Sequence, residues 1–219
     1  DTSLSYVYLN LFPRANFNWT IKPQTRLSIR YNGSTRQPTI EQLQPLNDNS
    51  DPFFERKGNP DLKQEFNHKI GLNFSDFKVL GNRSIYGYLD FTTTTNAIST
   101  NDQIVASGKR ISQPYNVSGN YSYGSYLGYG FKLKKSDFNI QFNANFSGSQ
   151  HNSIINNLTI RNKSGNYQLG VGGNYNKDKK IEFRLGIDGG YNTSKSNTIN
   201  NNYWSTSING DITVFLPWK

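Results

Sequence analysis

The sequence predicts an all-β fold, an antiparallel up-and-down meander of about nine strands. Its composition is poor in helix-forming residues and rich in strand and turn residues, with 19 Gly, 14 Tyr and 14 Phe but no Met, which favours strands joined by polar turns. The clearest pattern is the strict alternation over 138–148, where Phe138 and Phe142 fall on one face and Asn139 and Asn143 on the other. One face of this strand is apolar, and the other carries small polar groups.

The same alternation recurs along the chain, and each recurrence predicts a further strand. In chain order, the predicted strands are 4–21, 26–31, 66–74, 83–99, 115–134, 138–148, 166–175, 181–192 and 204–216. Short and long links alternate between them, the short ones at 22–24, 76–82, 134–136 and 176–180, and the long ones at 36–64, 100–114, 149–164 and 193–202. Short turns at one end and long loops at the other are typical of a transmembrane β-barrel of the bacterial outer membrane.

Composition excludes several other classes of protein. The chain has 219 residues, a net charge of +9 and no cysteine, so disulfide scaffolds, thiol nucleophiles and cysteine-ligated zinc are ruled out. No stretch approaches the roughly 18 consecutive apolar residues of a spanning helix. The chain opens Asp1-Thr2-Ser3 without methionine, and we therefore expect a piece of a longer protein.

A soluble β-sandwich would alternate as well, so the composition of the two faces decides between the classes. The polar face holds mainly Asn, Ser, Gln, Thr and Gly, which suits a wet lumen. The glycines on this face are Gly124, Gly128, Gly130, Gly170 and Gly172. Aromatic residues on the apolar face gather near the ends of the strands, as in the girdles of membrane barrels. They are Trp19, Phe138, Tyr175 and Trp218 at the short-turn end, and Phe66, Tyr191 and Trp204 toward the long loops.

Two blocks in the first long link carry a family resemblance. Residues 31–45 read Tyr-Asn-Gly-Ser-Thr-Arg-Gln-Pro-Thr-Ile-Glu-Gln-Leu-Gln-Pro, and residues 58–65 read Gly-Asn-Pro-Asp-Leu-Lys-Gln-Glu. Together with Leu11-Phe12-Pro13 and the segment 116–121, they resemble the barrel region of TonB-dependent-receptor-like outer-membrane proteins. We interpret the Gly/Pro punctuation of these blocks as residues that fold a long loop, with direct substrate contact as the alternative.

The resemblance implies a barrel of about 22 strands around an amino-terminal plug, which moves scarce nutrients inward with energy delivered through TonB. About nine strands cannot close such a barrel, so we expect residues 1–219 to form a partial barrel domain, with the plug, the TonB box and further strands outside it. The last residues, 214–219, lack the terminal aromatic carboxylate of complete barrels. The two bare strand edges of such a fragment could pair with another copy.

Few residues suggest a catalytic or metal-binding site. His68 and His151 are the only histidines and have no acidic or nucleophilic neighbour at a recognisable spacing, and the known catalytic motifs are absent. We expect no catalytic residue, no cofactor and no enzyme activity. Asp48 and Asp51 offer oxygen ligands at a calcium-like spacing but lack the glycine and distal glutamate of a complete loop. A solvated acidic loop is the simpler interpretation, with calcium as the alternative.

The excess of basic residues raises the question of an anionic partner. Nucleic acid is not expected, because the aromatic residues mostly share the apolar face while several lysines lie in the short turns. Arg26, Arg30, Lys69 and Arg184 fall on the polar face, where they could favour anionic solutes or lipopolysaccharide phosphates.

The sequence therefore predicts the barrel wall of an outer-membrane transporter that takes up an unidentified nutrient ligand. Its expected partners are outer-membrane lipid and lipopolysaccharide, and TonB through a segment outside the chain. The alternatives are a soluble or surface-exposed β-rich binding module, and an outer-membrane barrel without transport that serves adhesion or assembly. Since loops diverge among relatives, no ligand-binding residue is carried over from the resemblance.

Overall fold

A computed structural model describes residues 6–45, 47–78, 82–134, 136–177 and 181–215. Thirteen strands form one continuous sheet, and one helix of four residues lies at its edge. The elements are β1 Arg14–Lys22, β2 Thr25–Arg36, α1 Ile40–Leu43, β3 Asn47–Asp51, β4 Phe54–Lys57, β5 Glu65–Lys78, β6 Arg83–Thr95, β7 Ala97–Ile104, β8 Arg110–Val117, β9 Asn120–Lys132, β10 Phe138–Ile155, β11 Leu158–Lys177, β12 Ile181–Lys195 and β13 Asn200–Val214. No helix in the described part of the chain is long and apolar enough to cross a membrane.

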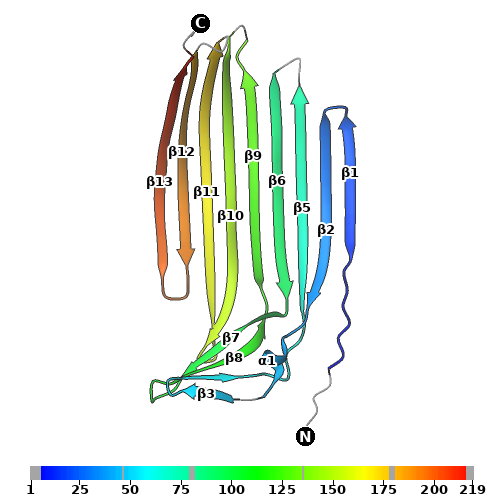
Figure 1. Ribbon diagram of the computed structural model, residues 1–219, viewed down its shortest axis with the longest axis vertical. Helices are drawn as coiled ribbons and strands as arrows, with labels where there is room; N and C mark the ends of the chain where they lie inside the picture. Colours follow the sequence, from blue (N-terminus) through cyan, green and yellow to red (C-terminus); the bar gives the residue numbers. More distant parts are fainter. Residues whose placement is uncertain (1–5, 46, 79–81, 135, 178–180, 216–219) are drawn as a thin grey trace.

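Nine strands form a tall wall in the order β1-β2-β5-β6-β9-β10-β11-β12-β13 (Figure 1), which confirms the predicted meander. Every neighbouring pair is antiparallel. The register places apolar residues beside apolar ones, since Phe142 lies opposite Tyr129 on β9 and Val171 on β11. One residue along, Asn143 lies opposite two glycines. Over the regularly alternating parts of its strands, the wall therefore has one apolar face and one polar face.

The apolar face is exposed and is not folded into a core. Phe142 is 48% exposed, Ile181 47% and Leu185 45%, although all three would be buried in a soluble sandwich. The aromatic pairs predicted for the two ends of this face are present, with ring centroids 5.9 Å apart for Phe138 and Tyr175 and 4.7 Å apart for Tyr191 and Trp204. The predicted Trp218 lies outside the described residues.

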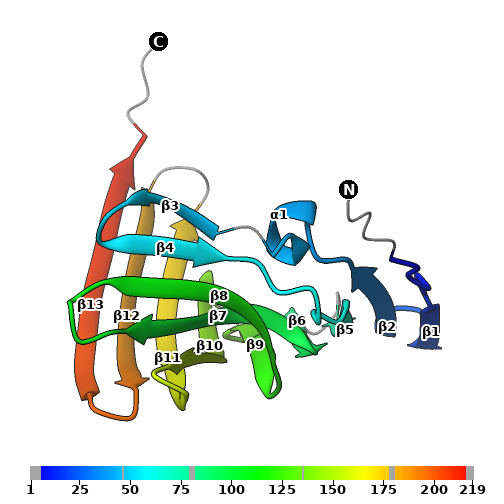
Figure 2. The ribbon, with the colours of Figure 1, turned by 90° about the horizontal axis from the view of Figure 1, so that it is seen from below.

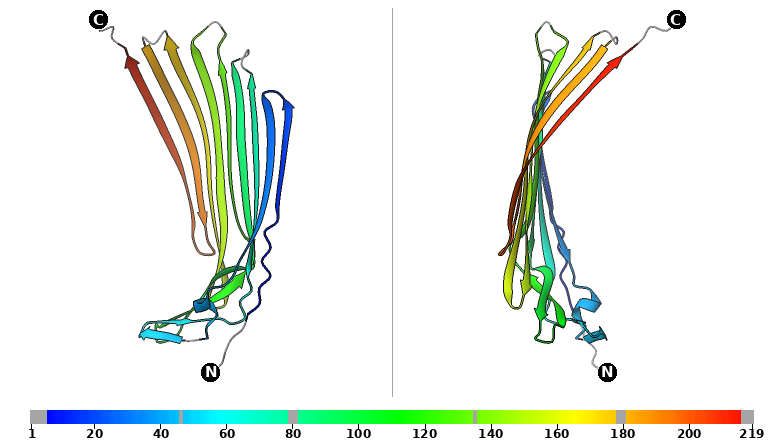
Figure 3. Two further views of the ribbon diagram at one scale, coloured as in Figure 1. Left: turned by 45° about the vertical axis from the view of Figure 1, so that its right-hand side comes forward. Right: turned by 90° about the vertical axis from the view of Figure 1, so that its left-hand side faces the viewer.

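The wall is strongly twisted and remains open (Figures 2 and 3). Its edges are β1 and β13, and within the described part of the chain neither edge strand pairs with a second neighbour. All residues of β13 are exposed. The outer side of each edge strand therefore presents backbone N–H and C=O groups that have no ladder partner among the described residues.

The ends of several strands differ from the prediction. The long links expected at 149–164 and 193–202 are largely strand, since the ladders run on to Ile155 opposite Leu158 and to Lys195 opposite Asn200. The β10–β11 hairpin turns at Asn156-Asn157, both with positive φ, which suits a tight hairpin. These outer strand segments carry polar residues on both faces, so the alternation that marks the wall is lost there.

The segments 83–99 and 115–134 are each two strands. Asn96 and Gly119, with φ of 53° and 85°, break them at the long-loop end of the wall, and the chain between these breaks forms the β7–β8 hairpin. The first predicted strand, 4–21, is shorter than expected because β1 begins only after Pro13, a residue that cannot donate to a ladder. The Pro13 carbonyl instead accepts a hydrogen bond from the Gly33 amide at 2.8 Å.

A small, four-stranded extension of the same sheet lies across the long-loop end of the wall (Figures 1 and 2). We call β3, β4, β7 and β8 the loop sheet. It joins the wall where β7 runs parallel to the end of β10. Within the loop sheet, β4 runs parallel to β8. The buried hydrophobic side chains among the described residues are Leu43, Leu62, Ala97 and Val117. All four belong to this end of the molecule, which therefore holds the compact core that the wall lacks.

Candidate functional site: the polar face of the wall and the loop sheet

The polar face of the wall is continuous from strand to strand. One line of paired residues is composed of Ser122, Ser149, Ser164 and Ser194, and the Ser149 and Ser164 hydroxyl oxygens are 2.9 Å apart. A neighbouring line brings Asn166 against Asn192, whose amide oxygen accepts a hydrogen bond at 2.6 Å. Such a surface of hydroxyl and amide groups suits a water-filled lumen.

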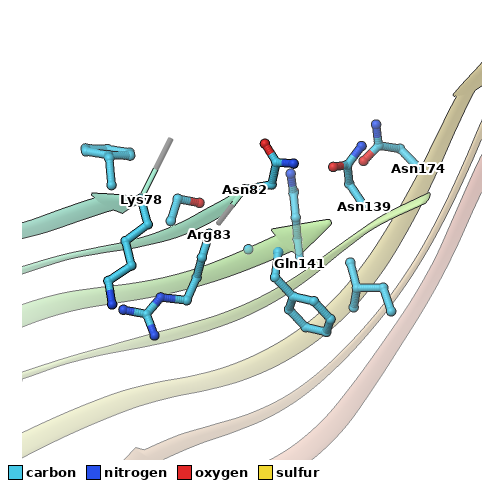
Figure 4. A pocket seen from close by; sticks show the side chains of 11 residues that line it. Lys78, Asn82, Arg83, Asn139, Gln141 and Asn174 are labelled. Carbon is cyan, nitrogen blue, oxygen red and sulfur yellow. The ribbon is translucent and has the colours of Figure 1, made fainter. Parts of the chain in front are cut away.

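Glycines hollow this face, as the sequence predicted. Near the short turns, Gly130 borders a depression of about 410 Å³, and Asn139, Gln141 and Asn174 project into it on one side of the strands (Figure 4). The side chains of Lys78 and Arg83 point to the opposite side of the strands, as strand alternation requires. A second depression of about 570 Å³ lies between β10 and β13, where glycines lie beside Arg184, Asp188 and Asp211.

Three tyrosines also lie on the polar face, a feature that the sequence analysis did not identify. Tyr88 pairs across the ladder with Tyr126, and Tyr86 pairs with Gly128. The Tyr126 ring is stacked with both others, with centroid distances of 5.4 Å to Tyr86 and 6.0 Å to Tyr88. The Tyr86 ring fills the space that a side chain at Gly128 would take. The cluster therefore presents three aromatic rings within an amide-rich lumen wall.

Charge is unevenly distributed across the polar face. Arg14, Arg26, Arg30 and Lys69 lie on β1, β2 and β5, exposed, and among the described residues none of them forms an ion pair. Arg184 on β12, which the sequence analysis also placed on the polar face, is paired: its guanidinium lies 3.6 Å from the Glu182 carboxylate. The strands at one edge of the wall thus present unpaired positive charge toward the lumen, while those at the other edge present both signs.

The two blocks that resemble TonB-dependent receptors fold the base of the loop sheet. Thr39 caps α1: its hydroxyl accepts a hydrogen bond from the Gln42 amide, and the Gln42 side chain accepts one from the Thr39 amide. Gly58 passes so close to the Gln44 carbonyl that any larger residue would overlap it. Asn59 then donates from its backbone to the Gln42 carbonyl at 2.6 Å and from its side chain to the Pro114 carbonyl at 3.0 Å.

These contacts confirm the interpretation that the two blocks serve to fold a long loop. Asn116 completes the junction by bonding both the Lys63 amide, at 2.7 Å, and the Lys63 carbonyl, at 2.9 Å. It also bonds the Asn96 carbonyl at 2.7 Å. The third resembling block therefore bonds the second block across a wide separation in sequence, and Asn59 in turn bonds the second block to the first.

The loop sheet also borders an open pocket of about 920 Å³ between α1 and strands β4 and β8. Phe54 contributes to its lining, and the guanidinium groups of Arg56 and Arg110 lie 5.3 and 5.5 Å from the centre of its ring. Glu55 points away from this cluster and pairs with Lys109 at 2.7 Å. The hydrogen bond from Lys109 lowers the pKa of Glu55 below its ordinary value.

The histidines and the calcium candidates lie apart from one another. His68 lies on the apolar face, where its Nδ1 is 2.9 Å from the Tyr31 hydroxyl, and His151 is exposed on the polar face. Asp51 accepts a hydrogen bond from the Phe53 amide at 2.8 Å, and the side chain of Asp48 lies outside the described part. Within the residues described, no group of three acidic or histidine side chains could hold a metal ion. The calcium alternative depends on the Asp48 side chain and stays a prediction.

The fold and its two-faced wall are those of a transmembrane β-barrel protein. The chain belongs to the outer membrane protein beta-barrel family, whose sequence profile matches residues 1–215. Neither a curated protein nor a solved structure shows a significant match to the chain. The family places the protein in the bacterial outer membrane, which overturns the alternative of a soluble β-rich binding module.

Proposed function

We propose that this chain is a barrel-wall portion of a TonB-dependent outer-membrane receptor that takes up a nutrient ligand. The observation that carries the proposal is the open nine-stranded wall with a hollowed polar face. Such a wall needs further strands before it closes, and barrels of about 22 strands are wide enough to hold a plug. The loop blocks that resemble these receptors support the same conclusion.

In this proposal the polar face performs recognition and passage and makes or breaks no bond. The unpaired cations of β1, β2 and β5 would attract anionic solutes toward the lumen. The stacked tyrosines Tyr86, Tyr88 and Tyr126 would offer flat surfaces to a passing ligand. The loop sheet, folded across the end of the wall, would contribute to the entrance.

Energy would come from TonB, which we expect to bind a segment that precedes the barrel, together with a plug inside the lumen. The open reading frame around this chain tests this directly, because it should encode a plug and a TonB box upstream. Uptake by the intact protein should also stop when TonB is deleted. A reading frame without a plug, or uptake that is independent of TonB, contradicts the proposal and favours a barrel for adhesion or assembly.

A further inference from the structure

Three cations gather on the apolar face at the long-loop end of the wall. Lys163 of β11 and Lys195 of β12 lie directly opposite one another in the ladder. Arg161 lies two residues before Lys163 on β11 and therefore projects from the same face. All three side chains are exposed. This arrangement, which we call the basic triad, does not belong to the lumen, because strand alternation points it toward the membrane side.

Nothing on this face neutralises the basic triad. In the described part of the chain none of the three residues forms an ion pair. The residues that flank Lys163 and Lys195 in the ladder are the amides Gln150 and Asn200. Like charges directly opposite each other destabilise a sheet, so a bound anion would relieve a repulsion that the protein does not itself compensate.

The aromatic girdle fixes the height of the basic triad relative to the membrane. Tyr167 and Tyr191 lie four residues from Lys163 and Lys195 on the same face, and Trp204 packs on Tyr191 at 4.7 Å. Aromatic rings of this kind lie at the boundary between the hydrocarbon and the headgroups. The basic triad lies four to six residues beyond these rings along the strands. It therefore lies at the level of the headgroups.

The opposite end of the same face is built differently. There Lys78 and Arg83 lie opposite one another on the apolar face, and Asp76 on the same face pairs with Arg83 at 2.9 Å. A general need for interfacial cations would not explain why the cations of one end have an acid among them and those of the other end do not. The difference indicates that the anion at the long-loop end is supplied by the surroundings.

We infer that the basic triad is a binding site for the phosphate groups of lipopolysaccharide. The long loops of outer-membrane barrels face the outside, and the lipid of that leaflet is lipopolysaccharide, whose membrane anchor carries phosphates. A phosphate bears up to two negative charges and accepts several hydrogen bonds, so it bridges two lysines and an arginine well. This inference requires only the outer-membrane location and does not depend on TonB-driven uptake.

The experiment uses the intact protein purified in detergent, in four forms: wild type, a Lys163→Gln/Lys195→Gln variant, a Lys163→Arg/Lys195→Arg variant, and Lys134→Gln. Lys134 is an exposed lysine in the turn between β9 and β10, at the opposite end of the wall, and serves as the matched control for loss of a lysine. Each form is titrated with phosphorylated lipid A, with dephosphorylated lipid A, with phosphatidylglycerol and with inorganic phosphate. Affinity and thermal unfolding temperature are measured.

We expect the Gln/Gln variant to bind phosphorylated lipid A at least tenfold more weakly than wild type, and to lose most of the thermal shift. The Arg/Arg variant and Lys134→Gln should behave as wild type. Without lipid, the Gln/Gln variant should unfold at the same temperature as wild type or slightly higher, which separates a binding defect from misfolding. Equal affinity for dephosphorylated lipid A, equal affinity for phosphatidylglycerol, or unchanged binding by the Gln/Gln variant would each overturn the inference.

Discussion

The wall and the loop sheet are built from the same chain but are stabilised in opposite ways. The wall has long, regular, antiparallel strands, and its large apolar side chains stay exposed, as Phe142 and Leu185 do. The loop sheet has short strands, two parallel junctions, and the buried Leu43 and Leu62. The wall relies on backbone ladders and surrounding lipid, whereas the loop sheet needs a core of its own because it projects into water.

The comparison also explains where the irregular hydrogen bonds lie. In the wall, backbone groups pair within the ladder and few side chains intervene. At the base of the loop sheet, Asn59 and Asn116 bond carbonyls from distant segments, because short strands and turns leave backbone groups that the ladder does not satisfy. Amide side chains thus replace the missing ladder at the points where the loop sheet meets the wall.

The largest expected effect concerns the core of the loop sheet. Leu43→Ala should lower the stability of this region by about 2–5 kcal/mol, because it leaves a cavity beneath α1. Hydrogen exchange over 40–62 and limited proteolysis measure the change. Ile40→Ala is the matched control, since Ile40 lies on the same helix and is 73% exposed. If the wall strands lose protection as much as the loop does, the two regions are not independent.

A charge on the membrane side of the wall should cost nearly as much. Leu169 lies midway along β11 and is 61% exposed on the apolar face. Leu169→Arg should therefore destabilise the folded protein in lipid by about 2–4 kcal/mol. Gln168→Arg, one residue away on the polar face, should have little effect. Urea titration in lipid vesicles distinguishes them, and equal costs for the two variants would mean that the faces are wrongly assigned.

A smaller effect is expected at the helix cap. Thr39→Ala removes the hydroxyl that accepts a hydrogen bond from the Gln42 amide at 3.3 Å. The loss should lower the stability of the helix by about 1 kcal/mol. The signature is increased proteolytic cleavage near 39–45 with the wall unaffected. Thr39→Ser keeps the hydroxyl and should restore protection; if it does not, the methyl group rather than the cap stabilises the turn.

The smallest effect is a pH dependence confined to the loop sheet. The pKa of Glu55 is lowered, chiefly by its hydrogen bond with Lys109, from an ordinary value of 4.5. The ion pair therefore contributes its stability above that ordinary value, and the contribution is lost as the pH falls through the lowered pKa of the folded state. Proteolysis of the loop followed from pH 7 to pH 3 should show this loss in wild type. Lys109→Gln should weaken it, and an unchanged profile in that variant would rule out the pair as its cause.

Alternation predicted the wall strands well where one face is apolar and the other small and polar, as in 138–148 and 181–192. It failed to show that Tyr86, Tyr88 and Tyr126 lie on the polar face, because tyrosines occur on both faces of the neighbouring strand β9 and their residue type does not identify the face. It also failed at the outer ends of β10–β13, which leave the apolar band and have no reason to alternate. The register with neighbouring strands settles these positions, and the sequence of one strand does not contain it.

The sequence by itself determined the class of the fold, the two faces of the wall and the residues that punctuate the loops, because each depends on contacts with lipid, water or near neighbours in the chain. Only the tertiary structure decided that β4 runs beside β8, that the buried side chains gather under the loops, and that Lys163 lies opposite Lys195. These features join residues far apart in sequence, and the pairing that joins them is a property of the assembled sheet.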